Sequence, residues 1–253
     1  MINRIIISLL ILSIGLSQQE YNINDLIEMD NGLFTVKFSD EPITGKVYGG
    51  FGESKPYKKV YMGNMVNGKQ EGRWKSYFHS NGKKSYDYNF RNGEKDGLTT
   101  EWFENGQRKR EGSYKDGEID GLWTSWYENG QMSFKGTYRD GEFDGLITTW
   151  YENGQKNGES NYKDGEMNGL NNSWFENGQK QLEGNSKNGK QDGLFTSWYE
   201  NGQKRIETTY KDGEKDGLVT WWYENGQKQL EITYKDGILT SRKDWNEDGS
   251  VRE

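Results

Sequence analysis

The dipeptide Asn-Gly recurs at a fixed interval of 24 residues through most of this 253-residue chain. A fixed period of about 20–50 residues is typical of repeat arrays, in which each unit is stabilised by its neighbours. The cleanest copy, GLWTSWYENGQ, covers residues 121–131. The seven pairs are Asn81-Gly82, Asn105-Gly106, Asn129-Gly130, Asn153-Gly154, Asn177-Gly178, Asn201-Gly202 and Asn225-Gly226. Asp248-Gly249 follows in a more polar segment, as expected of a terminal cap.

The residues around each Asn-Gly pair predict a β-hairpin. Residues 122–127 alternate with a period of two, and residues 131–138 supply a returning strand. Asn-Gly between two such runs favours a type I′ turn, in which both central residues have positive φ. The connection RDGEFDG at 139–145 then leads into the next hairpin. We therefore predict an all-β fold of about eight stacked antiparallel hairpins in one elongated, twisted sheet.

The repeated positions form columns when the units are aligned. We expect one face of the sheet to hold a structural core of leucines and tryptophans, and the other to present aromatic rings as a candidate binding face. The expected core residues are Leu98, Trp102, Leu122, Trp126, Leu146, Trp150, Leu170, Trp174, Leu194, Trp198, Leu218 and Trp222. The candidate binding-face aromatics are Phe103, Tyr127, Tyr151, Phe175, Tyr199 and Tyr223.

The composition fits a thin array better than a deep globular core. Apolar residues make up 30% of the chain, against about 45–50% in typical soluble domains with Gly included. Aromatic residues make up 14%, which argues against simple disorder. The net charge is −7 without a basic block, so we expect no nucleic-acid partner. The chain has no cysteine, which excludes disulfides and thiol chemistry.

The N-terminus reads as a signal peptide over residues 1–17. Arg4 gives a short positive region, residues 5–16 are dominantly apolar, and Gly15 and Ser17 are the small residues before a cleavage site. No second apolar stretch follows, so we expect no transmembrane segment after cleavage. The predicted location is extracytoplasmic: periplasm, cell surface or medium.

The sequence offers little for catalysis or for cofactors. His79 is the only histidine and lies beside the first predicted turn, so we expect no catalytic role for it. Pairs such as Asp116 and Asp120 lie in the connections, where Asp and Gly are also what tight turns need. We therefore predict no enzyme activity, no cofactor and no metal site.

The pattern G-x-W-x-x-W-Y-E-N-G-Q followed by G-x-Y-K-D-G-E-x-D-G resembles the variant MORN repeat of bacterial proteins, and in particular the YwqK-family antitoxins of toxin–antitoxin systems. The resemblance covers about residues 59–253, and residues 31–50 resemble that family's usual opening, for example at Pro42, Thr44 and Gly45. It implies stacked hairpins and no catalysis. The expected domains are a family-opening segment at 18–58 and the repeat array at 59–253.

Three functions remain open from the sequence. The first is a non-catalytic scaffold that mediates protein–protein or envelope interactions. The second is an antitoxin-like neutraliser of a partner toxin, and the third is carbohydrate binding through the Tyr and Phe rings. Weak self-association through the open ends of the sheet is also possible, because unpaired strand edges invite further pairing.

Overall fold

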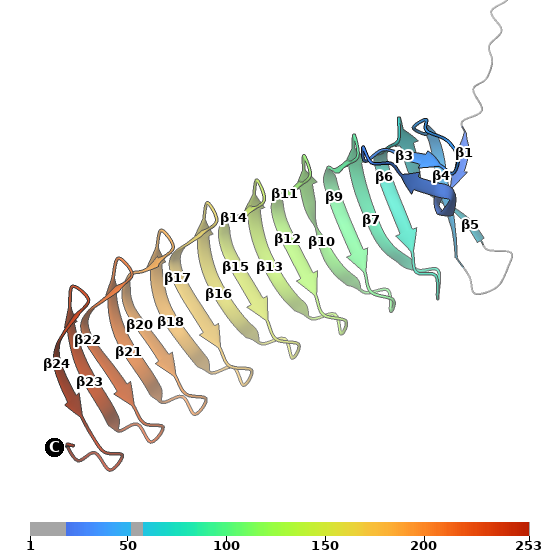
Figure 1. Ribbon diagram of the computed structural model, residues 1–253. Helices are drawn as coiled ribbons and strands as arrows, with labels where there is room; N and C mark the ends of the chain where they lie inside the picture. Colours follow the sequence, from blue (N-terminus) through green and yellow to red (C-terminus); the bar gives the residue numbers. More distant parts are fainter. Residues whose placement is uncertain (1–18, 52–57, 253) are drawn as a thin grey trace, which may run out of the picture.

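The protein is a long open sheet whose strands run across its long axis (Figure 1). The structure is a computed structural model that describes residues 19–51 and 58–252, so the predicted signal peptide lies outside the described residues. From β4 to β24 neighbouring strands pair antiparallel in chain order, and β1 pairs parallel with β4. The predicted all-β array of stacked hairpins is therefore confirmed.

The N-terminal end contains a short strand, a helical turn and a small second sheet. These are β1 (Glu20–Asn22), the 3-10 turn η1 (Ile23–Asp25), and the paired strands β2 (Leu26–Glu28) and β3 (Phe34–Val36). The first strands of the long sheet are β4 (Gly45–Phe51), β5 (Lys58–Val66), β6 (Lys69–Tyr77) and β7 (Lys84–Arg91). We call residues 19–51 the N-terminal cap.

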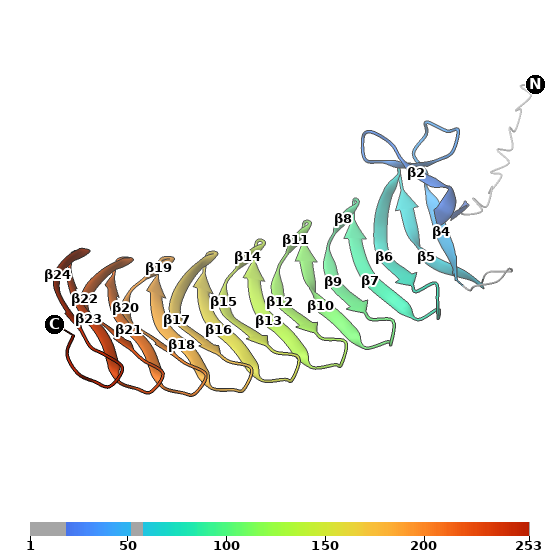
Figure 2. The same cartoon turned by 60° about the horizontal axis from the view of Figure 1, so that its bottom comes forward.

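The remaining strands repeat the hairpin along the array (Figure 2). They are β8 (Glu94–Lys95), β9 (Gly97–Trp102), β10 (Arg108–Lys115), β11 (Glu118–Ile119), β12 (Gly121–Trp126), β13 (Met132–Arg139), β14 (Glu142–Phe143), β15 (Gly145–Trp150), β16 (Lys156–Lys163), β17 (Glu166–Trp174), β18 (Lys180–Lys187), β19 (Lys190–Gln191), β20 (Gly193–Trp198), β21 (Lys204–Lys211), β22 (Glu214–Trp222), β23 (Lys228–Lys235) and β24 (Ile238–Asp244).

The two edges of the sheet use different turns, and this corrects the predicted turn type. Positive φ at two successive residues, the signature of type I′, occurs in the Asp-Gly connections such as Asp116-Gly117 (φ 48° and 86°). In the Asn-Gly turns only the glycine has positive φ. There the Gly106 N–H donates to Phe103 O and the Phe103 N–H to Gln107 O, both at 2.9 Å. This is a three-residue loop of a type I turn followed by a left-handed glycine.

The asparagines of these turns bind the next unit along the array. Each side chain accepts a hydrogen bond from the N–H two residues ahead and donates its amide to the glutamate carbonyl of the following turn. For Asn153 these bonds are 2.9 Å from Gln155 N and 2.9 Å to Glu176 O. The same donation is made by Asn81, Asn105, Asn129, Asn177, Asn201 and Asn225. We call this series the asparagine ladder.

The buried column of the sheet lies one residue after each leucine. Its members are Thr99, Trp123, Ile147, Asn171, Phe195 and Val219, all exposed by 9% or less. The large members pack over glycines of the preceding strand: Trp123 over Gly112, Ile147 over Gly136 and Phe195 over Gly184. A Cβ at any of these glycines would overlap the facing side chain, so glycine makes room for the ring or branch.

The predicted leucine core is wrong. The six leucines are 47–71% exposed, with Leu146 the least and Leu98 the most exposed. The tryptophans of the same face are half-buried. The physical reason is that the described chain is one layer thick over most of the array, so only the side chains of one face can close over neighbouring glycines. The compact cluster lies at the N-terminal end and consists of Ile43, Val47, Met62, Met65 and Trp74.

Replacing Asn153 by Asp should lower stability by about 1 kcal/mol, because the carboxylate keeps the acceptor for Gln155 N but loses the amide donor to Glu176 O. Urea unfolding followed by Trp fluorescence measures the change. The matched control is Asp248→Asn, since Asp248 occupies the last turn and binds only within it. Equal midpoints for Asn153→Asp and the wild-type protein would contradict the role of the asparagine ladder.

Candidate functional site

The candidate binding-face aromatics are half-buried, and several of them bind the next unit. We call the six residues Phe103, Tyr127, Tyr151, Phe175, Tyr199 and Tyr223 the aromatic ladder. The Tyr127 hydroxyl donates to Trp150 O at 2.7 Å, and the Tyr151 hydroxyl to Trp174 O at 2.8 Å. Tyr199 and Tyr223 make the equivalent bonds to Trp222 O and Trp245 O. These hydroxyls therefore connect repeats and are not available to a ligand.

The opposite face presents an exposed row of leucines. We call Leu98, Leu122, Leu146, Leu170, Leu194 and Leu218 the leucine ladder. Successive members lie two strands apart, or about 10 Å, because neighbouring strands are separated by about 4.8 Å. Polar side chains such as Thr137, Asn161 and Thr209 lie opposite them on the paired strands. The ladder is a continuous line of apolar contacts along the array.

The tryptophans of the same face are partly covered by lysines. The Lys156 Nζ lies 5.6 Å from the centroid of Trp174, and Lys204 lies at the same distance from Trp222. Lys156 also pairs with Glu159, and Lys204 with Glu207. The lysine charge is thus shared between an indole face and a carboxylate. The net charge of each such cluster is close to zero, and the leucine ladder beside it is the apolar feature of this face.

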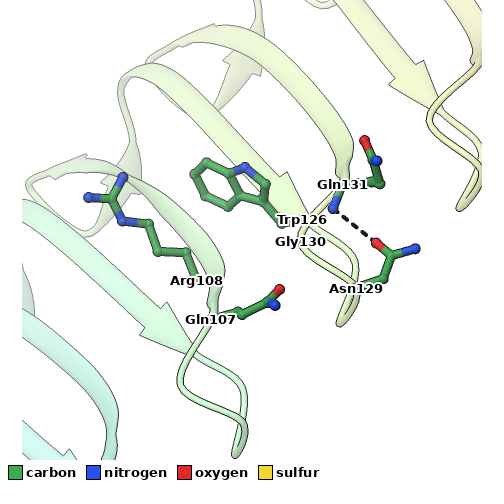
Figure 3. Close-up of a pocket in the computed structure, with 6 residues that line it drawn as sticks. All are labelled: Gln107, Arg108, Trp126, Asn129, Gly130 and Gln131. Atoms are coloured by element: carbon green, nitrogen blue, oxygen red, sulfur yellow. Dashed lines mark hydrogen bonds between the residues drawn. The ribbon is translucent and has the colours of Figure 1, made fainter.

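Shallow pockets lie along this face. One is lined by Leu98, Thr100 and Trp102 together with Arg73, Lys84, Asp87 and Asn89. The next lies at the Asn-Gly edge and includes Trp126, Arg108 and Gln107. Figure 3 shows the indole of Trp126 turned toward the strand that carries Arg108, and the Asn129 side chain accepting the Gln131 N–H at 2.9 Å.

The first of these pockets contains the most buried carboxyl group of the face. Asp87 is 6% exposed and accepts two hydrogen bonds from Arg73, at 2.6 and 2.7 Å, with Lys84 at 3.3 Å. Burial alone would raise the pKa of Asp87, but the hydrogen bonds from Arg73 and Lys84 outweigh it and hold that pKa below its ordinary value. The acid is therefore a structural anion that neutralises two cations.

The glutamines of the repeated phrase form a contact that sequence reasoning missed. A Cβ on Gly130 would lie 2.6 Å from Gln107 Oε1, and the same close approach joins Gln203 to Gly226 at 2.9 Å. Each glutamine thus lies against the glycine of the following turn, which must have positive φ and no side chain. The 24-residue spacing of Gln and Gly was the available signal, since it places like turns side by side.

No group of three His, Cys, Asp or Glu side chains suited to a metal ion occurs among the described residues. The paired acids of the connections lie in or beside tight turns, where Asp116, Asp140 and Asp212 adopt positive φ. No described helix is long and apolar enough to cross a membrane. The features of this chain that could serve a function are therefore its surfaces: two ladders on opposite faces of a narrow sheet.

A single-layered array of stacked hairpins, each bound to the next by side chains that recur every 24 residues, defines a β-repeat protein. The comparisons with known proteins agree. The family model of the MORN repeat variant matches residues 95–116, 119–140, 143–164, 191–212 and 215–236, so the chain is built on MORN-variant repeats. No catalytic family is among the matches, and no curated protein matches the chain significantly.

One repeat lies outside the matched segments. The unit between residues 164 and 191 places Asn171 in the buried column, where its neighbours have Ile147 and Phe195. The Asn171 amide donates to the buried hydroxyl of Ser186 at 2.8 Å. This unit keeps the turns and hydrogen bonds of the array but replaces its apolar contacts by polar ones.

Removing the hydroxyl of Tyr151 should destabilise the array. Tyr151→Phe loses the 2.8 Å bond to Trp174 O, at a cost of about 0.5–1.5 kcal/mol in urea unfolding. The chain offers the reverse experiment: Phe175→Tyr places a hydroxyl at a matching position facing the next unit and should stabilise by a similar amount. If both variants unfold at the wild-type midpoint, the aromatic ladder does not connect repeats.

The stability contributed by Asp87 should be lost in acid. Because its folded-state pKa lies below the unfolded value of about 3.9, this contribution is full above that value and disappears as the pH falls through the folded pKa. Asp87→Asn should therefore be less stable than the wild type at pH 7, with the difference shrinking between about pH 4 and 2. Urea midpoints across this range measure it, and a constant difference would refute the assignment.

Proposed function

We propose that the protein is a non-catalytic scaffold that binds a protein partner along its leucine ladder. One observation carries the proposal: six leucines in one line remain 47–71% exposed on the folded chain. Contiguous apolar surface of this kind typically marks an interaction site in soluble proteins. A repeat array suits this role because it presents the same contact at regular intervals over a long surface.

The aromatic ladder is the weaker candidate for the binding face. Its tyrosine hydroxyls donate to backbone carbonyls of the next repeat, and its rings are half-buried. Carbohydrate binding through these rings loses support for the same reason, because stacking on a sugar needs an open ring face. The leucine ladder makes no comparable contact that would account for its composition.

The proposed place of action is outside the cytoplasm. The support for it is the signal-peptide pattern of residues 1–17, with its apolar stretch and small residues before position 18. A scaffold in that compartment would hold a partner at the cell envelope. The antitoxin alternative rests on the sequence resemblance to the YwqK family and predicts a toxic, cytoplasmic partner.

Exchanging three leucines for lysine should abolish partner binding without unfolding the array. The bait is the tagged full chain carrying Leu122→Lys, Leu146→Lys and Leu194→Lys. Because these side chains are 47–54% exposed, each change should alter stability by only about 0.5 kcal/mol. Affinity capture from the producing cells, read by mass spectrometry, should then lose the specific partner seen with the wild-type bait.

The matched control carries the same three added charges on the turn edge. Gln131→Lys, Gln155→Lys and Gln203→Lys use a residue that the first unit already has at this position, where Lys83 Nζ donates to Asn105 O at 2.8 Å. This bait should retain the partner. Equal retention by all three baits would overturn the leucine ladder as the binding face, and a captured protein that is toxic when expressed alone would favour the antitoxin function.

A further inference from the structure

Phe38 lies in a turn that normally requires glycine. It is the third residue of the four-residue turn from Val36 to Ser39, closed by the Ser39 N–H donating to Val36 O at 3.2 Å. Its φ is +65°, in the left-handed region that bulky residues avoid because Cβ approaches the following carbonyl. The eight other non-glycine residues described with positive φ are all Asn or Asp. A phenylalanine here stores backbone strain.

The contacts around the turn hold Phe38 in this conformation. Thr35, which is 4% exposed, places its hydroxyl 3.0 Å from Ser39 O and 2.8 Å from Glu41 O. The Glu41 N–H donates to Ser39 Oγ at 3.2 Å. The Ile43 N–H then donates to Phe34 O, which ties the loop to the buried cluster. The loop is fixed on both sides of Phe38, so the ring is held in one direction.

The ring of Phe38 packs against nothing in the described chain. Its exposure is 106%, against 71% for Leu98, the next most exposed large apolar side chain described. The β2–β3 hairpin and its loops stand off the end of the array (Figure 2). An aromatic ring that is both strained and fully exposed stabilises no part of the folded chain. Strain of this kind concentrates at functional sites, and aromatic anchors dominate binding energy at interfaces.

The surface around Phe38 is acidic. The N-terminal cap has six acidic residues, Glu20, Asp25, Glu28, Asp30, Asp40 and Glu41, and two basic ones, Lys37 and Lys46. Two of the acids, Asp40 and Glu41, follow Phe38 almost directly and are exposed. A surface that meets this one needs an apolar pocket for the ring and basic groups around it. Anionic bilayers and nucleic acids would be repelled.

We infer that Phe38 is a binding anchor of the N-terminal cap, which inserts into an apolar pocket with a basic rim on a partner protein. This contact lies on the cap, away from the leucine ladder, and does not depend on the function proposed for that ladder. The turn pre-orders the ring, so little conformational entropy is lost when it is buried. Backbone strain in the free protein is retained because the ring's position serves the contact.

The test combines a photo-crosslinker with a binding measurement. The full chain carries a benzophenone amino acid at position 38, and the control chain carries it at Ile238, which is 70% exposed at the other end of the sheet. Irradiation in the producing cells should give a protein adduct at 38 that is absent at 238. The captured protein, identified and purified, should bind wild-type protein at least about 10-fold more tightly than Phe38→Gly, with affinity falling as salt rises.

Phe38→Gly should melt at or above the wild-type temperature, because glycine relieves the positive φ and no packing is lost. A fall in melting temperature would show that the ring stabilises the fold, and would overturn the inference. So would the absence of an adduct specific to position 38, or equal affinity of both proteins for the captured partner. Binding to neutral phosphatidylcholine vesicles that is lost in Phe38→Gly would instead identify a membrane contact. Loss of binding by the leucine variants alone leaves the cap contact intact, so the two proposals fail separately.

Discussion

The hydrogen bonds that connect one turn to the next are the interaction on which this structure depends. A sheet that is one layer thick has no opposing layer to bury its faces, and a single hairpin is at most marginally stable in water. Stability must therefore be gained along the array. The backbone ladder gives part of it, and the asparagine ladder adds a side-chain bond at every repeat. The amide serves here because one side chain has to accept within its own turn and donate to the next.

Packing on the buried face follows the same rule of neighbour dependence. Trp123, Ile147 and Phe195 fill space left by Gly112, Gly136 and Gly184 on the preceding strand, so each core residue is completed by another unit. The polar unit around Asn171 interrupts this column while the turns continue unchanged. In a nearest-neighbour array such a unit weakens coupling between the two sides without breaking the sheet. The N-terminal cap, with its compact cluster, closes one end.

The two proposed contacts differ in physical character. The leucine ladder is periodic, apolar and spread along the array, so it suits an elongated partner surface. The contact at Phe38 is a single point, strained and surrounded by acids, so it suits one pocket. Together they give the protein an extended face and a fixed anchor at one end. The aromatic ladder, by contrast, is committed to holding the repeats together through the hydroxyls of Tyr127, Tyr151, Tyr199 and Tyr223.

The sequence by itself determined the repeat, its period, the hairpin and the all-β array. These follow from local rules: alternation sets strands, Asn-Gly and Asp-Gly set turns, and a constant 24-residue spacing places like residues side by side. It did not determine which face is buried, because alternation is symmetric and large residues occur on both faces. Only the tertiary structure decided that Trp123 closes over Gly112 while Leu122 remains in solvent. The reason is that burial in a single sheet depends on the gap left by the neighbouring strand, and that gap is set by pairing register between units.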